Sequence, residues 1–544
     1  MKVVLPLRWL RGGALLALAA IVAVPLQAGG AGEAIYRHGI LPSGAPLHAA
    51  REQGMRLEGE VAACVNCHRR SGLGMIEGHV SIPPVAGSYL FHPRAATGDD
   101  LDLPFVAGMR ADRDPYTDDT LARAIRQGIG ADGRPLDVLM PRYDLDDAQM
   151  AALIAYLKEL SPGAVPGVTD SVLHFATIFT PDSDPVARQG VLNVLTRFFE
   201  DKNHFTRAQS PRLRSSRRLR FKVNRHWELH VWQLEGAPET WDAQLRAFLH
   251  AQPVFAVISG LGGRTWEPVH HFCEAEELPC LFPNVDLPVD NERDFDTVYF
   301  SKGVLLEAEL IAHALRAADA GPGPHRLVQV YRSNDVGAAA AARLRAALGQ
   351  EEGWHVDDVG LAATGTHAAL RSAVAEAHAG DVLVLWLRPA DIAALGPVPA
   401  GVHAVYMSGR MGGLDDTPLP EAWRASTHMA YPFDMPAHRT VQVDYPLGWF
   451  RIRQIPVVAQ QVQADTYLAC IILSDTLNHM VDTFVRDYLV ERIEEMLEHR
   501  ILTGYYPRLA LAPNQSFASK GGYIVHFSPG GGKQVVADGE WITP

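Results

Sequence analysis

The sequence predicts a multidomain protein in which a small all-α domain precedes a larger α/β domain with two lobes. The chain has 544 residues, which is enough for several domains. Its residues 161–167 read SPGAVPG, a Pro/Gly-rich linker. After this linker the pattern changes from helices alone to strands that alternate with helices. We therefore expect a first domain over 35–161, a linker over 162–167 and a second domain over 168–544.

The N-terminal segment has the layout of an export signal. Residues 1–11 carry Lys2, Arg8 and Arg11 and no acid, and residues 13–26 are an apolar run. This run is shorter than the about 20 residues of a transmembrane helix. We expect a signal peptide over 1–28, a periplasmic location and no membrane span after cleavage. An uncleaved N-terminal anchor is the alternative.

The segment Cys64-Val65-Asn66-Cys67-His68 is the motif with the most specific chemistry. C-x-x-C-H is the attachment sequence of c-type haem, in which two thiols join the porphyrin and the histidine binds the iron. A zinc ribbon would need a second C-x-x-C, and the sequence has none. The motif predicts one covalent haem c per chain, bound by Cys64 and Cys67 with His68 as an iron ligand.

Two helices are expected after this motif. Thr117 or Asp118 can cap a helix that runs to Gln127, and Asp146 can cap a final helix with apolar positions at helical spacing. Between them lies Met140, followed by a proline. A thioether on such a loop is the usual sixth ligand of electron-transfer cytochromes c.

Residues 35–161 resemble a class I mono-haem cytochrome c, and the resemblance implies His68 and Met140 as axial ligands. Met75, Met109 and Met150 are competitors for the sixth position. Met75 lies only seven residues after His68, which is a short connection for reaching across the haem. Met150 lies on the apolar face of the final helix, where core packing is the expected role.

The second domain shows short apolar strands alternating with helices, which is typical of a parallel sheet covered on both faces. Two blocks, roughly 168–300 and 301–440, predict two lobes. Apolar spacing predicts one long helix from Asp465 to Arg500, with strands such as 522–527 after it. The other expected strands are 173–179, 229–234, 254–259, 280–282, 326–331, 382–387 and 402–407, and the other expected helices run to about 200, over 240–250, 267–277 and 338–348.

This order of elements resembles the type I periplasmic solute-binding family, in particular the branched-chain amino-acid binding proteins. The segments 179–190 and 258–263 resemble its first strand-loop-helix and its ligand loop. The ligand positions differ from the family's small hydroxyl residues, because they read Gly262-Gly263-Arg264-Thr265 and Pro283-Asn284-Val285-Asp286. We expect a small-molecule ligand to contact the residues Arg264, Thr265, Asn284 and Asp286. The alternative is a fold that has lost its ligand.

Charge and the remaining cysteines give further expectations. The net charge of −13 argues against nucleic acid as a partner. Residues 207–225 contain eight basic residues and no carboxylate, which suggests either a solvated loop or a docking surface for an acidic redox partner. Cys273 and Cys280 could pair in an oxidising compartment, and Cys470 is expected to be a buried apolar residue.

These observations favour a periplasmic electron-transfer protein fused to a solute-binding-like module. A resemblance to components of quinoprotein alcohol oxidation suggests a quinoprotein dehydrogenase as redox partner. The alternative is a solute-binding receptor or sensor with an accessory haem. Catalysis is less favoured than electron transfer, since a dihaem peroxidase would need a second C-x-x-C-H.

Overall fold

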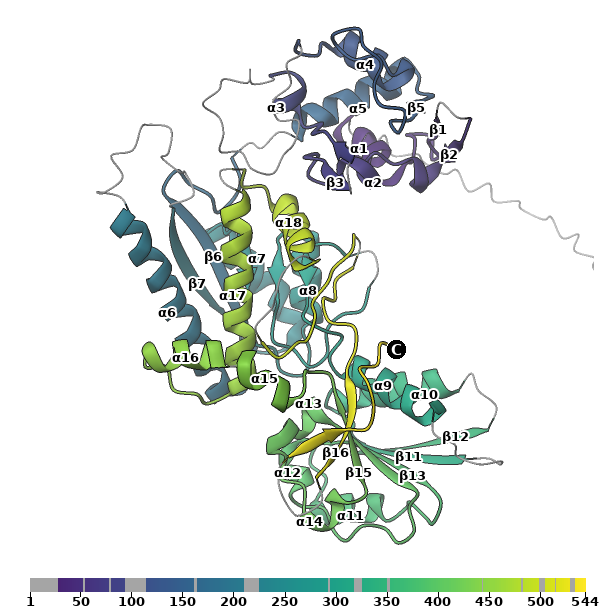
Figure 1. Ribbon diagram of the computed structural model, residues 1–544, viewed down its shortest axis with the longest axis vertical. Helices are drawn as coiled ribbons and strands as arrows, with labels where there is room; N and C mark the ends of the chain where they lie inside the picture. Colours follow the sequence, from purple (N-terminus) through teal and green to yellow (C-terminus); the bar gives the residue numbers. More distant parts are fainter. Residues whose placement is uncertain are drawn as a thin grey trace, which may run out of the picture. The chain divides into compact units, whose positions relative to one another are not determined.

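The chain forms two compact units in its computed structural model (Figure 1). The first consists of Met1–His68, Val85–Pro93 and Arg113–Ser161, and the second of Arg69–Pro84, Arg94–Asp112 and Pro162–Pro544. The structure describes residues 28–544 except 52–53, 78–79, 93–113, 161–163, 210–224, 292–293, 318–324, 350–352, 443, 481–482, 499–503, 514 and 529–533.

The first unit is mainly helical, as predicted, with one small antiparallel sheet. The sheet has the order β2 (Arg56–Glu58), β1 (His48–Ala50), β5 (Arg142–Tyr143). The helices are α1 (Ala28–Glu33), a π-helix (Ala34–His38), a 3₁₀-helix (Gly59–Ala62), α2 (Val65–His68), α3 (Gly87–Leu90), α4 (Asp118–Gln127) and α5 (Asp147–Glu159).

The ends of α4 and α5 follow from their capping residues. The Thr117 hydroxyl accepts a hydrogen bond from the backbone N–H of Thr120 at 3.2 Å, and the Asp146 carboxylate accepts one from Gln149 at 2.8 Å. These caps satisfy N–H groups that have no partner within the helix. Gly128 ends α4 with a φ of 70°, a left-handed conformation that favours glycine.

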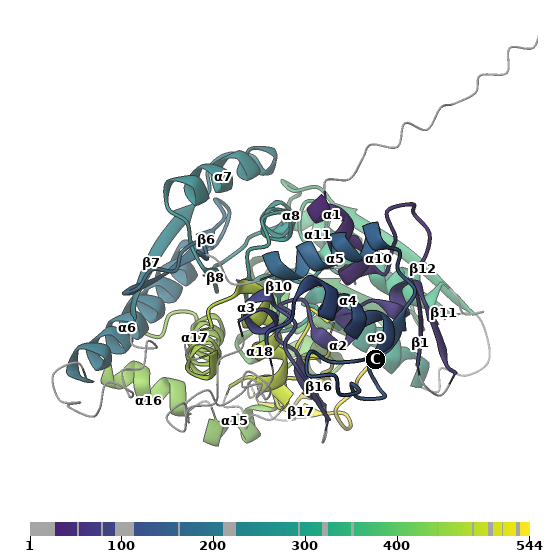
Figure 2. The ribbon, with the colours of Figure 1, turned by 90° about the horizontal axis from the view of Figure 1, so that it is seen from above.

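The first lobe of the second unit is built on a parallel sheet of order β10-β9-β8-β6-β7. Figure 2 shows α7 and α8 on one face of this sheet and α6 and α17 on the other. The strands are β6 (Val172–Phe179), β7 (His226–Gln233), β8 (Ala256–Ile258), β9 (Cys280–Leu281) and β10 (Thr297–Val298), and the helices are α6 (Pro185–Gln209), α7 (Trp241–Ala251), α8 (Glu267–Ala275), α16 (Asp444–Ile452), α17 (Gln460–Met480) and α18 (Arg486–Glu498).

The second lobe contains a seven-stranded mixed sheet of order β12-β11-β13-β14-β15-β16-β17. Helices α9 (Val304–Ala317) and α10 (Gly337–Leu348) pack on one face, around buried residues such as Trp386. The strands are β11 (His325–Arg332), β12 (Trp354–Leu361), β13 (Val382–Trp386), β14 (Ala404–Ser408), β15 (Thr427–Tyr431), β16 (Tyr523–Phe527) and β17 (Val535–Ala537), and the shorter helices are α11 (His367–Val374), α12 (Pro389–Ile392), α13 (Gly409–Gly412), α14 (Glu421–Arg424) and α15 (Pro436–Gln442).

The predicted blocks 168–300 and 301–440 hold strands β6–β10 of the first lobe and β11–β15 of the second, and the chain after residue 440 contributes to both lobes. Helices α17 and α18 return to the first lobe, where α17 packs beside α6. The C-terminal strands β16 and β17 then complete the sheet of the second lobe by antiparallel pairing with β15. Their alternating apolar pattern does not show which sheet they join, because strand pairing is a long-range choice.

The single long helix predicted from Asp465 to Arg500 is wrong, since α17 ends at Met480 and α18 begins at Arg486. The backbone N–H of Thr483 donates to the Met480 carbonyl at 3.0 Å. This bond joins residues three apart, instead of the four of an α-helix. The Arg486 guanidinium donates to the Val254 carbonyl in the first lobe at 2.6 Å. This tertiary contact fixes the start of α18, and apolar spacing alone does not reveal it.

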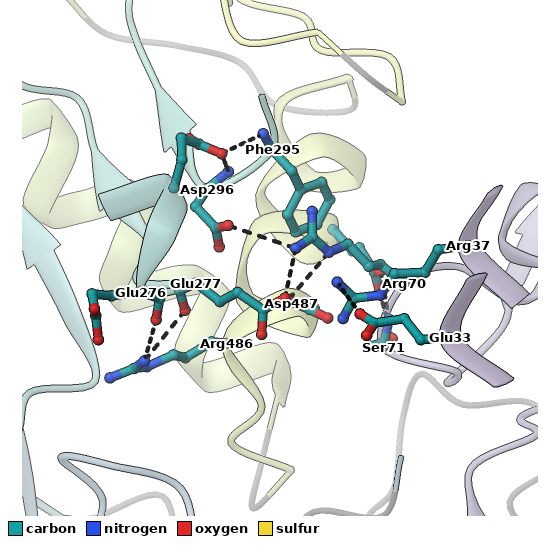
Figure 3. A network of polar contacts seen from close by, with 12 residues as sticks. Glu33, Arg37, Arg70, Ser71, Glu276, Glu277, Phe295, Asp296, Arg486 and Asp487 are labelled. Carbon is teal, nitrogen blue, oxygen red and sulfur yellow. Dashed lines mark hydrogen bonds and ion pairs between the residues drawn. The ribbon is translucent and has the colours of Figure 1, made fainter. Parts of the chain in front are cut away.

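The residues directly after the C-x-x-C-H motif belong to the second unit. Figure 3 shows the Arg70 guanidinium between two carboxylates of this unit. It lies 3.7 Å from Asp487, 3.8 Å from the fully buried Asp296 and 3.1 Å from Glu277. It also stacks over the Phe295 ring at 4.4 Å. These contacts hold the segment that starts one residue after His68.

Ser71 and Arg69 hold the same segment on α18. The Ser71 backbone N–H and hydroxyl donate to the two carboxylate oxygens of Glu491 at 2.9 and 2.5 Å, and Arg69 pairs with Glu494. The short strands β3 (Met75–Glu77) and β4 (Val80–Ile82) follow and pair with each other. Residues 69–84 therefore pack with the second unit, although they lie within the range 35–161 predicted for the first domain.

Two predictions concern residues that the structure does not describe. The signal peptide predicted over 1–28 lies outside the described residues, apart from Ala28. The same holds for most of the basic run 207–225, of which Arg225 is described and stacks over the Phe484 ring at 4.5 Å. Within the described part of the chain, no helix combines the length and the apolar character that crossing a membrane requires.

Candidate functional site

The C-x-x-C-H motif folds into a single helical turn, α2. The backbone N–H of His68 donates to the Cys64 carbonyl at 2.9 Å, and that of Cys67 donates to the same oxygen at 3.2 Å. One turn of helix brings positions i and i+3 to the same face. Both thiols are therefore on one side of the turn, as attachment to the two vinyl groups of one porphyrin requires.

The two motif cysteines are half-buried and form no disulfide, and the His68 side chain is buried with 7% exposure. Burial raises the pKa of the Cys64 thiol to about 12, although a hydrogen bond with Tyr143 opposes the shift. Tyr143 itself donates to the Ala62 carbonyl at 3.1 Å. This bond ties strand β5 to the residues just before the motif.

Met140 lies on a loop braced by backbone contacts. Its N–H donates to the Asp137 carbonyl at 3.1 Å, and its own carbonyl accepts from the Arg142 guanidinium. The half-buried Met140 side chain packs against the apolar cluster that Cys64 and Val65 also contact. One core thus supports both the attachment turn and the loop of the predicted sixth ligand.

The competing methionines have different positions. Met150 is 2% exposed in the core face of α5, which agrees with a packing role. Met75 lies in β3, within the segment that packs in the second unit. Met109 lies outside the described residues.

The donor set of the first unit fits a c-type haem. It offers two thiols that form no disulfide, a buried imidazole one residue later and a thioether beside the same apolar cluster. The buried members of that cluster are mostly aliphatic and aromatic, which suits the apolar faces of a porphyrin.

A second site lies in the second unit, as a cleft of about 830 Å³ between the lobes. Most of its lining comes from the carboxyl ends of the parallel strands and the segments that follow them, where ligands of open α/β sheets bind, and helix α17 adds the rest. The charged lining residues are Asp182, Asp184, Arg264, Asp286, Arg332, Asp335, Arg388, Asp391, Arg410 and Asp465.

Ion pairs cross this cleft from one lobe to the other. Asp286, after β9, lies 2.7 Å from Arg388, which follows β13, and 3.6 Å from Arg410, which follows β14. Arg388 also binds Asp335 at 2.8 Å. Burial alone would raise the pKa of Asp286, but the charges and hydrogen bonds of Arg388 and Arg410 outweigh it and hold that pKa below its usual value.

Two buried carboxyl groups lie close to Arg410. Glu307 is fully buried and accepts hydrogen bonds from the Ser408 hydroxyl and the Arg410 backbone N–H. Burial raises its pKa to about 7, and these bonds oppose the shift. Asp465 is 4% exposed, and burial raises its pKa to about 7 against the charge of Arg410 and a hydrogen bond from Tyr506.

The structure brings three of the four predicted ligand residues to this cleft. Arg264, Asn284 and Asp286 line it, whereas Thr265 lines a smaller neighbouring hollow of about 380 Å³. Each of the three already has partners: Arg264 pairs with Asp182 at 3.1 Å, and Asn284 donates to Ser259 at 2.9 Å and to the Gly260 carbonyl at 3.0 Å.

Sequence reasoning missed the arginines of the second lobe. Arg332, Arg388 and Arg410 each stand at or just after the end of a strand, namely β11, β13 and β14. The carboxyl ends of parallel strands meet at one edge of a sheet, so this position was the signal that could have identified them.

The remaining cysteines are all buried and free. Cys273 and Cys280 belong to the same apolar cluster of the first lobe, and burial raises the pKa of Cys273 well above its usual value, with Cys280 as a hydrogen-bonding neighbour. They form no disulfide in this structure. Cys470 is a fully buried residue of α17, as expected.

Comparison with known proteins identifies the family of the first part of the chain and the fold of the second. Residues 59–161 match the Cytochrome c family, so this segment is a cytochrome c domain. A fatty acid ABC transporter substrate-binding protein from Thermomonospora curvata matches with a TM-score of 0.50 and 13% identity, over 70% of this chain and 95% of its own. No curated protein matches the sequence.

Two other solved structures are similar to this chain. An ABC transporter substrate-binding protein from Aeropyrum pernix matches with a TM-score of 0.50 and 13% identity, over 69% of this chain and 96% of its own. A leucine-binding protein from Thermotoga maritima has a TM-score of 0.46 at 13% identity, with 68% and 99% covered. At this identity the likeness concerns the fold alone. The predicted fold class, a cytochrome c domain followed by a two-lobed binding-protein fold, is confirmed.

Proposed function

We propose that this protein is a c-type cytochrome of the periplasm that transfers electrons through one covalent haem and binds a small polar solute in its second unit. The observation that carries the proposal is the helical turn at α2, where Cys64 and Cys67, which form no disulfide, precede a buried histidine. Export supports the same reading, because haem is joined to C-x-x-C-H outside the cytoplasm.

In this proposal Cys64 and Cys67 would tether the porphyrin, and His68 and Met140 would bind its iron. The bound haem would supply one-electron exchange. The chain supplies the iron ligands and an apolar environment. Hydrogen bonds with Asp137 and Arg142 hold the loop that carries Met140. A thioether ligand raises the reduction potential, which suits electron transfer rather than reaction with peroxide.

Covalent attachment is tested on the exported full-length protein. We expect one haem per chain that stays with the polypeptide through denaturation and acid-acetone extraction. Replacing both Cys64 and Cys67 with alanine should release it. Haem that extracts freely from the unmodified protein would contradict the proposal.

The sixth ligand is tested by two matched variants. Met140→Ala should remove the weak long-wavelength charge-transfer band of methionine bound to ferric haem and should lower the reduction potential. Met150→Ala, which alters a buried core residue of α5, should keep the band. A band that survives Met140→Ala would assign the ligand to another methionine.

For the solute, the paired charges of the cleft support a small ligand that carries both acidic and basic groups. Such a ligand would replace the Asp286–Arg388 contact: its ammonium group would pair with the Asp286 carboxylate, and its carboxylate would accept two hydrogen bonds from the Arg388 guanidinium. A thermal-shift screen of the holoprotein against amino acids, organic acids and polyamines tests this. A true ligand raises the melting temperature of the second unit with concentration.

A receptor or sensor with an accessory haem is the second candidate, supported by the size of the cleft. A ligand that shifts the melting temperature but leaves the rate of haem reduction unchanged would favour it. For the electron donor we propose a quinoprotein alcohol dehydrogenase. Stopped-flow reduction of the haem by such a purified enzyme, compared with a flavin-dependent one, tests this assignment.

A further inference from the structure

Strands β6 and β7 carry three metal-binding side chains that neither proposed site uses. His174 on β6 is the direct partner of Glu228 on β7, and His230 follows two residues later on β7. Paired residues of adjacent parallel strands point to the same face of a sheet, and so do residues two apart. Register therefore places two imidazoles and one carboxylate together.

The donor atoms of these side chains are close to one another. Nδ1 of His174 lies 3.0 Å from Nε2 of His230 and 3.7 Å from a carboxylate oxygen of Glu228. Nε2 of His230 lies 3.9 Å from the other oxygen of Glu228. Two donor atoms that each lie about 2.0–2.1 Å from a tetrahedral zinc ion are about 3.3 Å apart. One of the three donor–donor distances here is slightly shorter than this value and the other two are slightly longer.

From this geometry we infer that His174, Glu228 and His230 form a binding site for one zinc ion. Two imidazole nitrogens and one carboxylate are a donor set that zinc accepts, with water in the fourth position. Within the described residues these are the only three such side chains that come within metal-ligand reach of each other. The side chains are 14%, 51% and 20% exposed, so a zinc ion and its water can reach them from solvent.

The site is separate from the solute cleft. His174 lies five residues before the end of β6, about 16 Å along a strand, whereas the cleft begins after the last residue of that strand. β7 is the edge strand of its sheet, and the backbone N–H of His174 bonds to Gly167 in the linker that enters the second unit. A bound zinc ion would cross-link this entry strand to the edge strand.

Zinc binding to the holoprotein tests the inference. After treatment with EDTA and dialysis against Zn²⁺, zinc per chain is measured by mass spectrometry and compared with the variant His174→Ala/His230→Ala. We expect the variant to lose one zinc per chain and to lose the rise in melting temperature that Zn²⁺ causes. Equal zinc content and an equal temperature rise in both proteins would overturn the inference.

His226 provides the matched control, because it lies on the same face of β7 two residues before Glu228 and contacts Asn203 instead. His226→Ala should bind zinc as the unmodified protein does. If the double variant fails to fold, Glu228→Gln and zinc-edge X-ray absorption of the unmodified protein decide. A zinc ion coordinated by two histidine nitrogens and a carboxylate would support the site. A coordination shell without histidine, or unchanged zinc binding by Glu228→Gln, would refute it.

Discussion

Replacing Asp465 with asparagine should change how the stability of the second unit depends on pH. Asp465 lies on α17 in the cleft and is 4% exposed. The ordinary pKa of an aspartate is 3.8, and burial raises the pKa of Asp465 to about 7. The Arg410 charge and the Tyr506 hydrogen bond oppose this shift without cancelling it. Between these two pH values the folded protein holds a proton that the unfolded chain has released.

The sign and size of the effect follow from proton linkage. Because the folded state binds more protons, its stability falls as pH rises from about 4 to about 7. Each tenfold change in proton affinity is worth about 1.4 kcal/mol, so this one group lowers the free energy of unfolding by about 4 kcal/mol across that range. Asparagine has the same shape and does not titrate, so Asp465→Asn lacks this contribution.

Urea unfolding at pH 4 to 8 measures the difference. Far-UV circular dichroism follows the second unit, and the Soret band follows the first, since two units need not unfold in one transition. The control is Asp475→Asn, at a half-buried position on the same helix. The curves of Asp465→Asn and the unmodified protein should diverge with pH. Parallel curves would refute the assignment of a buried, protonated Asp465.

Three further predictions concern stability. Asp146→Ala removes the cap of α5 and should destabilise the first unit by about 1 kcal/mol, seen as a lower urea midpoint of the Soret transition; an unchanged midpoint would contradict the capping role. Arg70→Leu removes the hydrogen bond to Glu277 and the charged contacts to Asp296 and Asp487, and it should cost the second unit about 1.5–3 kcal/mol, with faster proteolysis at 69–84. Unaltered cleavage would exclude these contacts. Gly303→Ala would place a Cβ 2.1 Å from the Asp286 carbonyl oxygen, at a backbone φ of 59°, and should destabilise the second unit by about 1–3 kcal/mol. The control is Gly448→Ala, whose Cβ meets no atom within 4 Å and which should leave the melting temperature unchanged or raise it.

Local features of the sequence predicted the architecture well. The caps Thr117 and Asp146 and the stop at Gly128 act within a few residues, so the bounds of α4 and α5 follow from them. Short apolar runs predict many strands of the second unit, such as β6, β8 and β13, but not β12 or β15. The same reasoning failed between Met480 and Arg486, because the helix break is set by contacts with the first lobe.

The sequence by itself determined the cytochrome c domain, since C-x-x-C-H is contiguous and one helical turn assembles it. It also determined the alternation that builds a two-lobed α/β fold. Only the tertiary structure decided which side chains share the cleft, since Asp286 and Arg388 are 102 residues apart in the chain. The same is true of His174 and His230, which strand register brings together. Pairing of distant strands depends on the packing of whole lobes, and no short stretch of sequence records it.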